Sequence, residues 1–250
     1  MSGHSKWHSI KHKKGAADAK RGKLFTQHAK MIVLAAQQGG GDPDMNPSLR
    51  SAIDRAKMDN VPNNNIERAV KKGSGELKDG NVISETTYEG YGPGGTAIFV
   101  EVVTDNKNRC VASVRHIFTK HGGNLGANGC VAWMFEKKGV IILNTEGMDM
   151  EEVEMAVIES GADDMSVEGG TMEIFTAYQD LMEVKKALET AGMKVESADI
   201  SYIPKDTVKV DDPSTAKKIL KLMDALEEDE DVSNVSSNFD IPEEILEEVA

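Results

Sequence analysis

Positively charged side chains are concentrated at the start of this sequence, where they could bind phosphate groups. Within the first 23 residues a single acid, Asp18, stands against seven cationic residues: Lys6, Lys11, Lys13, Lys14, Lys20, Arg21 and Lys23. Cations at this density neutralise several phosphates and release the counterions condensed on them. Trp7 adds an aromatic group of the kind that stacks on bases. The segment is therefore predicted to be an arm that binds a polyanion, and the alternative is a tail that only keeps the chain in solution.

The charge of this leading region is opposite to that of the rest of the chain. The formal net charge of the 250 residues is -13, but residues 1–78 hold 15 Lys/Arg against 7 Asp/Glu, a net charge of +8. Residues 79–250 hold 14 Lys/Arg against 35 Asp/Glu, a net charge of -21. Because salt screens exposed charges within about 8 Å at physiological ionic strength, the distant acidic part does not cancel the basic one. We expect the two parts to face different partners.

A glycine-rich segment could bind a dinucleotide, but its surroundings do not fit that chemistry. Gly90–Gly95 has the GxGxxG spacing, yet a strand-like segment follows it where a dinucleotide site needs the start of a helix. A tight turn that displays Tyr88 and Tyr91 is the better interpretation. The sequence also contains no P-loop, no Ser–His–Asp arrangement and no HExxH motif. It therefore predicts a protein that is not an enzyme and has no small-molecule substrate, and the alternative is an enzyme that uses Tyr88 or Tyr91 in this turn.

The histidines and cysteines give little support for a metal or redox site. His4, His8 and His12 would share one face of a helix, but no carboxylate completes a metal site there. Cys110 and Cys130 lie in apolar surroundings without CxxC spacing, so we expect two buried thiols, with a disulfide or metal role as the alternative. No metal and no cofactor are predicted.

The elements after the arm begin with a pattern typical of a small helical bundle. Apolar residues at helical spacing run from Leu24 to a stop at Gly39, a second helix is predicted after Asn46, and a third follows Pro62 and ends at Gly73. The outer face of the third helix carries three more predicted nucleic-acid-binding residues: Arg68, Lys71 and Lys72.

The signals after residue 79 predict two α+β domains of ferredoxin-like type, one inserted into the other. The outer domain is predicted from two β-α-β segments, whose elements are Thr96–Thr104, Lys107–Lys120 and Gly129–Phe135, then Asp206–Val210, Pro213–Leu226 and Val232–Phe239. Residues between them show the complete order β-α-β-β-α-β. The predicted division is an arm 1–23, a helical domain 24–78, a split α+β domain 79–135 and 204–240, an inserted α+β domain 136–203 and a tail 241–250.

A second, weaker cationic patch is predicted on the helix that begins after Asn106. Arg109, His116 and Lys120 share the face opposite the apolar residues, and an ordinary solvated helix face explains them equally well. The predicted sheets lack the aromatic pattern with which RRM domains stack bases. Contacts to phosphates and to nucleic-acid shape are therefore expected to dominate over base reading.

Five separated segments, in order, closely resemble the YebC/PmpR family across essentially the whole chain: GHSKWHSIKHKKGAADAKRGKLF, NIERAVKKGSGE, YEGYGPGGTAIFVEVVTDNKNR, GGNLGANGCVAWMFEKKG and NFDIP. The resemblance implies a non-enzymatic cytoplasmic protein with an N-terminal helical domain and two α+β domains. The absence of an apolar run near the roughly 18 residues of a membrane span, and of the apolar core of a secretory signal, agrees with a soluble protein that does not bind membranes.

The resemblance implies two functions, both of which need contact with nucleic acid. Members are described as probable transcriptional regulators that bind DNA, whereas mitochondrial relatives activate translation of cytochrome oxidase and bacterial members are linked to relief of stalled ribosomes. The expected partner is accordingly promoter DNA, or ribosomal and transfer RNA in the ribosome. No recognition helix is evident apart from residues 64–72, while a cationic arm suits a narrow RNA cavity. A different class stays open, in which the acidic domains bind a protein.

Overall fold

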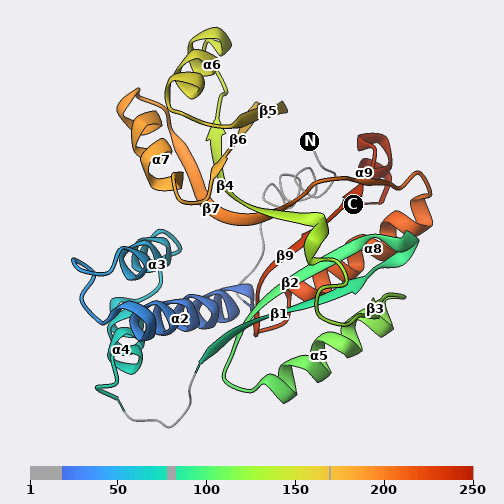
Figure 1. Ribbon diagram of the computed structural model, residues 1–250, viewed down its shortest axis with the longest axis horizontal. Helices are drawn as coiled ribbons and strands as arrows, with labels where there is room; N and C mark the ends of the chain where they lie inside the picture. Colours follow the sequence, from blue (N-terminus) through green and yellow to red (C-terminus); the bar gives the residue numbers. More distant parts are fainter. Residues whose placement is uncertain (1–18, 78–82, 169, 250) are drawn as a thin grey trace.

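The computed structural model describes residues 19–77, 83–168 and 170–249. Figure 1 shows a group of helices and two separate sheets with their own helices, and each of these regions has its own buried apolar cluster. This mixed, multidomain α+β architecture confirms the predicted fold class. The domain boundaries given above stay a prediction. Among the described helices, none combines the length and apolar character needed to cross a bilayer.

The helical region consists of α2 (Ala19–Gly39), α3 (Pro47–Met58) and α4 (Asn63–Gly73), which pack around a shared apolar core. The helix α3 begins where predicted, because the Asn46 side chain accepts a hydrogen bond from the Leu49 N–H and caps its first turn. Gly73 ends α4 against α2, where an added Cβ would lie 2.5 Å from the Ala36 Cβ. The bundle thus needs a residue without a side chain at this crossing.

The first sheet has the strand order β3-β1-β2-β9, and its neighbouring strands are antiparallel. Its strands are β1 (Ser84–Tyr91), β2 (Ala97–Thr104), β3 (Asn124–Leu125) and β9 (Val232–Ser237). The helices α5 (Lys107–Lys120) and α8 (Pro213–Glu227) share one buried cluster with the inward residues of β2, so both cover the same face of the sheet. The short helix α9 (Glu243–Val249) packs on α8.

The connections within this region differ from the predicted pair of β-α-β segments. The strand predicted at Gly129–Phe135 is wrong, because residues 129–134 form a loop with the 3-10 turn η2 (Ala132–Met134), and Phe135 already begins the next strand. Backbone N–H groups of this loop bond to the carboxylate of Glu89, so they are not available to a neighbouring strand. Asp206–Val210 contributes only β8 (Val208–Lys209), which pairs in parallel with β10 (Phe239–Asp240). The strand that completes the sheet is β1, whose mostly polar sequence did not stand out.

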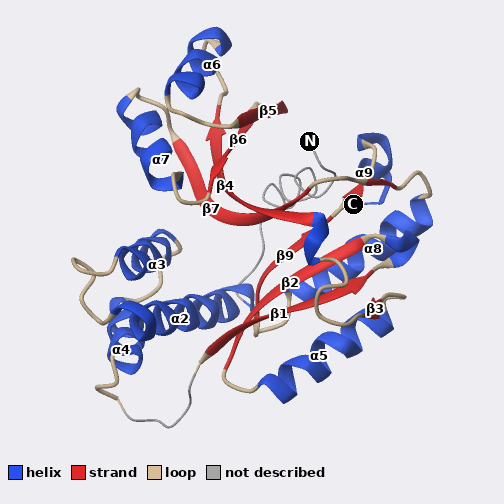
Figure 2. Cartoon of the chain, in the orientation of Figure 1, coloured by secondary structure: helices blue, strands red, loops and turns tan. Residues whose placement is uncertain are grey.

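The second sheet has the order β5-β6-β4-β7 and confirms the predicted β-α-β-β-α-β arrangement. Its elements are β4 (Phe135–Asn144), α6 (Met150–Glu159), β5 (Asp164–Glu168), β6 (Thr171–Ala177), α7 (Leu181–Thr190) and β7 (Val195–Pro204). Strands β4 and β7 are paired from Phe135 and Pro204 onward, so the chain enters and leaves this region side by side. Figure 2 shows this two-stranded connection leading to the first sheet.

Aromatic side chains pack at the junction of the two sheets. The ring of Phe99 on β2 lies 4.5 Å from that of Tyr202 on β7 and 5.9 Å from that of Phe135 on β4, centroid to centroid. Phe99 points away from α5 and α8, because alternate residues of a strand face opposite sides of the sheet. The face of the first sheet opposite α5 and α8 is therefore covered by the ends of β4 and β7 that carry Phe135 and Tyr202.

Candidate nucleic-acid interface

The predicted phosphate-binding arm lies mostly outside the part of the chain that the structure describes. This applies to five of its predicted binding residues: Lys6, Trp7, Lys11, Lys13 and Lys14. Lys20 and Arg21 lie in the first turn of α2, and Lys23 follows within the same helix. The position of α2 therefore decides where the arm joins the body of the protein.

One side of α2 is held against the end of α8 and the turn that follows it. Lys23 Nζ donates to the Glu227 carbonyl, and Gln27 Nε2 donates to the Val232 carbonyl at 2.6 Å. Lys30 Nζ donates to the Glu230 carbonyl at 2.7 Å. The spacing of these three donors, i, i+4 and i+7, places them on one face of the helix. Lys23 thus has an intramolecular partner, and its contact with phosphate stays a prediction.

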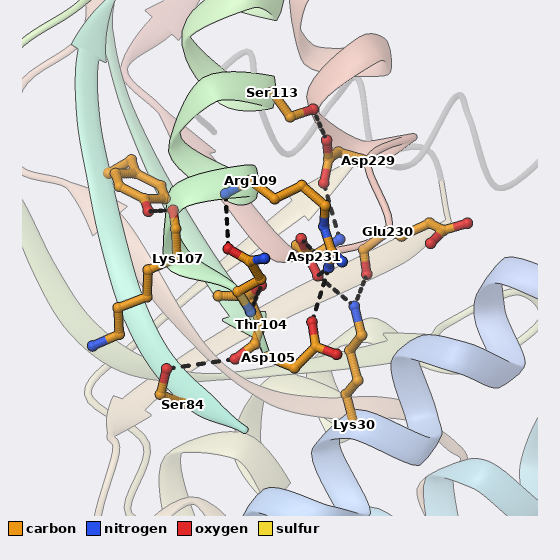
Figure 3. A network of polar contacts seen from close by, with 12 residues as sticks. Lys30, Ser84, Thr104, Asp105, Lys107, Arg109, Ser113, Asp229, Glu230 and Asp231 are labelled. Carbon is orange, nitrogen blue, oxygen red and sulfur yellow. Dashed lines mark hydrogen bonds and ion pairs between the residues drawn. The ribbon is translucent and has the colours of Figure 1, made fainter. Parts of the chain in front are cut away.

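The carboxylate of Asp231 joins α2, α5 and β9 in one polar network, which Figure 3 shows. Asp231 is 5% exposed and accepts hydrogen bonds from Lys30 Nζ at 2.6 Å and from Arg109 Nη2 at 3.0 Å. Arg109 also bonds to Asp105 at 3.0 Å. Burial raises the pKa of Asp231, but the hydrogen bonds and charges of Lys30 and Arg109 outweigh burial and lower it. Arg109, predicted to bind nucleic acid, therefore has a structural task, and its contact with phosphate stays a prediction.

We expect Asp231→Asn to lower the free energy of unfolding by about 2 kcal/mol at pH 7, because Lys30 loses its charged partner and Arg109 loses one of its two. The lowered pKa means that this contribution is present above the unfolded pKa of about 3.9 and disappears as the pH falls through the folded value. Urea unfolding at pH 7 measures the loss. The control is Asp211→Asn, at an exposed ion pair with Lys209. Equal stability of the two variants would contradict this role of Asp231.

The predicted cations on α4 lie on a separate surface. Arg68 and Lys71 are exposed on the outer side of the helix, and Lys72 is half-buried. No ion pair joins Arg68 or Lys71 to a described carboxylate. Gly73 packs beside Val33 and Ala36 of α2, so α4 lies near the far end of that helix from the arm. The structure therefore does not bring these cations and the start of α2 together.

The loop at residues 129–134, predicted as a strand, presents an exposed tryptophan. The Glu89 carboxylate is 4% exposed and accepts N–H bonds from Gly129, Val131 and Ala132 at 2.6, 2.8 and 2.7 Å. Burial raises the pKa of Glu89, but these three backbone bonds outweigh it and lower the value. Trp133, in the same loop, is 67% exposed, and its indole N–H donates to the Cys130 carbonyl at 3.2 Å. An ordered, exposed indole offers a stacking surface.

The glycine-rich segment forms the turn between β1 and β2. Its 3-10 turn η1 (Pro93–Gly95) is closed by the Gly92 N–H, which donates to the Thr96 carbonyl at 2.8 Å. A strand follows, as predicted, and the dinucleotide arrangement is absent from this turn. Tyr91 lies at the end of β1 and donates its hydroxyl hydrogen to the Cys130 carbonyl at 3.0 Å. The motif thus shapes the loops beside Trp133.

The described residues contain no cluster that could hold a metal ion, and their two cysteines are free. No group of three His, Cys, Asp or Glu side chains there could hold a metal ion, and His4, His8 and His12 lie outside them. Cys110 is buried and Cys130 half-buried, and both are free thiols. Burial, followed by the charges of Asp231 and Asp229, raises the pKa of Cys110 to about 11, which keeps it protonated at neutral pH.

The fold and these surfaces define a multidomain α+β protein with a cationic N-terminal region. A family model described as the TACO1/YebC protein N-terminal domain matches residues 5–76, and one described as the TACO1/YebC second and third domain matches residues 83–239. The chain belongs to the TACO1/YebC family, which confirms the resemblance noted in the sequence.

Similar proteins match over nearly their full length. A protein of Halothermothrix orenii named "Probable transcriptional regulatory protein" is 54% identical over 251 residues, covering 100% of this chain and 99% of its own. A protein of Geobacter sp. strain M21 with the same description is 55% identical over 249 residues, covering 100% of both chains. The crystal structure of a conserved hypothetical protein from Aquifex aeolicus is 49% identical, with a TM-score of 0.85 over 92% of this chain and 94% of that one.

Proposed function

We propose that this protein is a non-catalytic regulator of gene expression in the cytoplasm that binds nucleic acid through its basic N-terminal region, with ribosomal RNA as its main target. The observation that carries the proposal is the net charge of +8 on residues 1–78, set against -21 on the remainder. A region of that charge attracts phosphates over a Debye length of about 8 Å at physiological salt. The names of the relatives support the regulatory role.

The spread of the cationic groups favours folded RNA over a DNA groove. The arm joins at Ala19, while Arg68 and Lys71 lie near the other end of α2, about 25 Å of helix away. A DNA reader places one element in the major groove, with a few side chains directed at neighbouring bases. Separated contacts instead suit an irregular RNA surface, where unpaired bases are also free to stack on an indole such as that of Trp133.

Promoter DNA is the alternative target within this proposal, and the printed names of the relatives favour it. The helix α4 is the candidate recognition element, since Arg68 and Lys71 are exposed on it. Both side chains could equally contact phosphates, which fix orientation without reading sequence. Discrimination between promoter sequences is therefore the property that separates the two targets.

Cosedimentation with purified ribosomes, beside promoter-DNA binding at the same salt concentration, tests the proposal. We expect saturable binding to ribosomes and weak DNA binding that does not depend on sequence, because phosphate contacts alone carry no sequence information. Ribosomes stripped of bound factors and a shuffled promoter sequence serve as controls. Sequence-specific promoter binding without ribosome association would overturn the RNA target, and absence of both interactions would overturn nucleic-acid binding altogether.

A second candidate function, binding of a basic protein, is favoured by the inserted region. Residues 135–204 hold 16 acidic and 5 basic residues. Met155 and Ile158 on α6 are 58% and 62% exposed, and Met182 on α7 is 57% exposed. Exposed methionines beside acidic residues suit a cationic amphipathic segment. In that case, removing charge from the arm would leave function intact.

A further inference from the structure

A second basic surface lies on the outer sides of α5 and α8. We call it the α5/α8 basic face, and it consists of Arg115, His116, Lys120, Lys217, Lys218 and Lys221, all of them exposed. The sequence contains no acidic residue from Lys107 to His121, and none from Pro213 to Met223. This stands out in a part of the chain whose net charge is -21.

The fold brings these cations together from segments about a hundred residues apart in the sequence. Val114 and Phe118 of α5 share one buried cluster with Ile219 and Leu222 of α8 against Ile98 of β2. Both helices therefore lie on the same face of the first sheet, and their exposed sides point away from it. Figure 1 shows α5 and α8 beside the same sheet.

The positive charges of the two helices converge around His121, the residue that ends α5. Its pKa is lowered, first by burial and then by the charges of Lys120, Lys221 and His116. Lys120 belongs to α5 and Lys221 to α8, so one imidazole is close enough to both helices to experience their charges. The two helices therefore place positive charges within electrostatic reach of the same side chain.

Among the described residues, these cations form no ion pair with a carboxylate. No ion pair links Arg115, Lys120 or Lys221 to a described carboxylate, in contrast to Arg109 on the same α5, which bonds to Asp231 and Asp105. The same holds for Lys217 and Lys218. Of the acids that begin α8, Asp212 is engaged with the N–H and hydroxyl of Thr215. The charge of Lys218 adds to the hydrogen bonds of Thr215 in lowering the pKa of Asp212, so this acid balances part of the charge of the face. Like charges held close together cost stability, which a ligand of opposite charge would recover.

We propose that the α5/α8 basic face is a second binding site for the phosphate backbone of RNA, separate from the arm. This proposal rests on the proposed function and adds to it a site on the folded body. Lysines supply most of the charge, and a lysine acts as a point charge toward phosphate without the planar fork that reads bases. The face therefore adds affinity and position, not sequence preference.

The test compares two charge-matched triple variants of the full chain. The first is Lys120→Gln/Lys218→Gln/Lys221→Gln, and the control is Lys185→Gln/Lys186→Gln/Lys194→Gln in the inserted region. Binding of a short RNA duplex of mixed sequence is measured by fluorescence anisotropy over a series of KCl concentrations. We expect the first variant to bind about tenfold more weakly, with the slope of log K against log salt reduced by about 2, and the control to match the unmodified protein.

The outcomes separate this proposal from the proposed function. Circular dichroism confirms that the variants are folded, and all three lysines are exposed, so substitution leaves the core intact. If the triple variant binds with unchanged affinity and salt slope while neutralisation of the arm weakens binding, the second site is wrong and the proposed function stands. If neither change affects binding, the proposed function fails with it. Equal losses of RNA affinity in both triple variants would show that the effect depends only on the net charge of the protein. That result would also overturn the site.

Discussion

Replacement of Lys6, Lys11, Lys13 and Lys14 by glutamine is expected to weaken ribosome and RNA binding by about 100-fold near physiological salt, because the four proposed phosphate contacts and the counterions they release would be lost. The salt dependence should flatten at the same time, by about 3 in the slope of log K against log salt. These four residues precede α2, and they are distinct from Lys23 and Lys30, whose head groups bond to the body. Anisotropy with RNA and cosedimentation with ribosomes measure both quantities.

The control removes the same charge elsewhere, from four lysines outside the basic region 1–78 and the α5/α8 basic face: Lys185, Lys186, Lys194 and Lys209. Affinity within about twofold of the unmodified protein is expected for it, since exposed charges far from the ligand are screened. Trp7→Ala in the natural arm separates stacking from charge, because it should lower affinity without altering the salt slope. If the arm variant binds RNA as tightly as the unmodified protein, the arm is not the binding site. The acidic inserted region would then be the candidate functional surface.

The second large effect is expected from Glu89→Gln, which should lower the stability of the fold. The carboxylate accepts three backbone N–H groups, and in glutamine an NH2 group replaces one oxygen and faces a donor. We expect the free energy of unfolding to fall by about 3 kcal/mol, since buried N–H groups are left without an acceptor. Urea unfolding measures it. Glu85→Gln makes the same change at an exposed site of β1 and should alter stability by less than about 0.5 kcal/mol.

The pH dependence of this difference identifies the carboxylate as its source. The pKa of Glu89 is lowered by its backbone bonds, so the ionised group stabilises the fold above the unfolded pKa of about 4.3, and this contribution is lost as the pH falls through the folded value. The stability gap between the unmodified protein and Glu89→Gln should therefore be full at pH 7 and shrink in acid. A gap that stays constant to pH 3 would indicate a packing defect. Trp133 fluorescence would report whether the loop itself is displaced.

Local sequence signals predicted the elements whose stabilising groups are close in the chain. The helix α3 follows from Asn46 and the apolar spacing after it, and the inserted β-α-β-β-α-β region follows from regular turns between its elements. The apolar sequence of Gly129–Phe135 predicts a strand, because it carries no sign of the distant partner that makes it a loop. That partner is Glu89, some 40 residues earlier, and its carboxylate determines the backbone path.

The candidate binding surfaces could likewise be predicted only where their residues lie close together in the sequence. The arm could be recognised because its cations lie close together in the sequence, although the structure leaves its contacts untested. Arg109 looked like a surface cation, since nothing near it in sequence reveals Asp231. Lys120 and Lys221 are ordinary solvated helix residues when considered one helix at a time. Their combination depends on α5 and α8 packing side by side, which is a tertiary property.

The attachment of α2 to the end of α8 has a consequence for affinity. Since Lys23 and Lys30 hold α2 to Glu227 and Glu230, the cations before Ala19 are tethered close to the helix that carries Lys221. Lys6 lies 13 positions before Ala19, which limits its reach from that residue to at most about 45 Å. An RNA already seated on one surface thus meets the other at an effective concentration on the order of millimolar. Two individually weak binding sites would together give tight binding through avidity. Separating the two sites would lose this gain in affinity, although each site kept all of its own contacts.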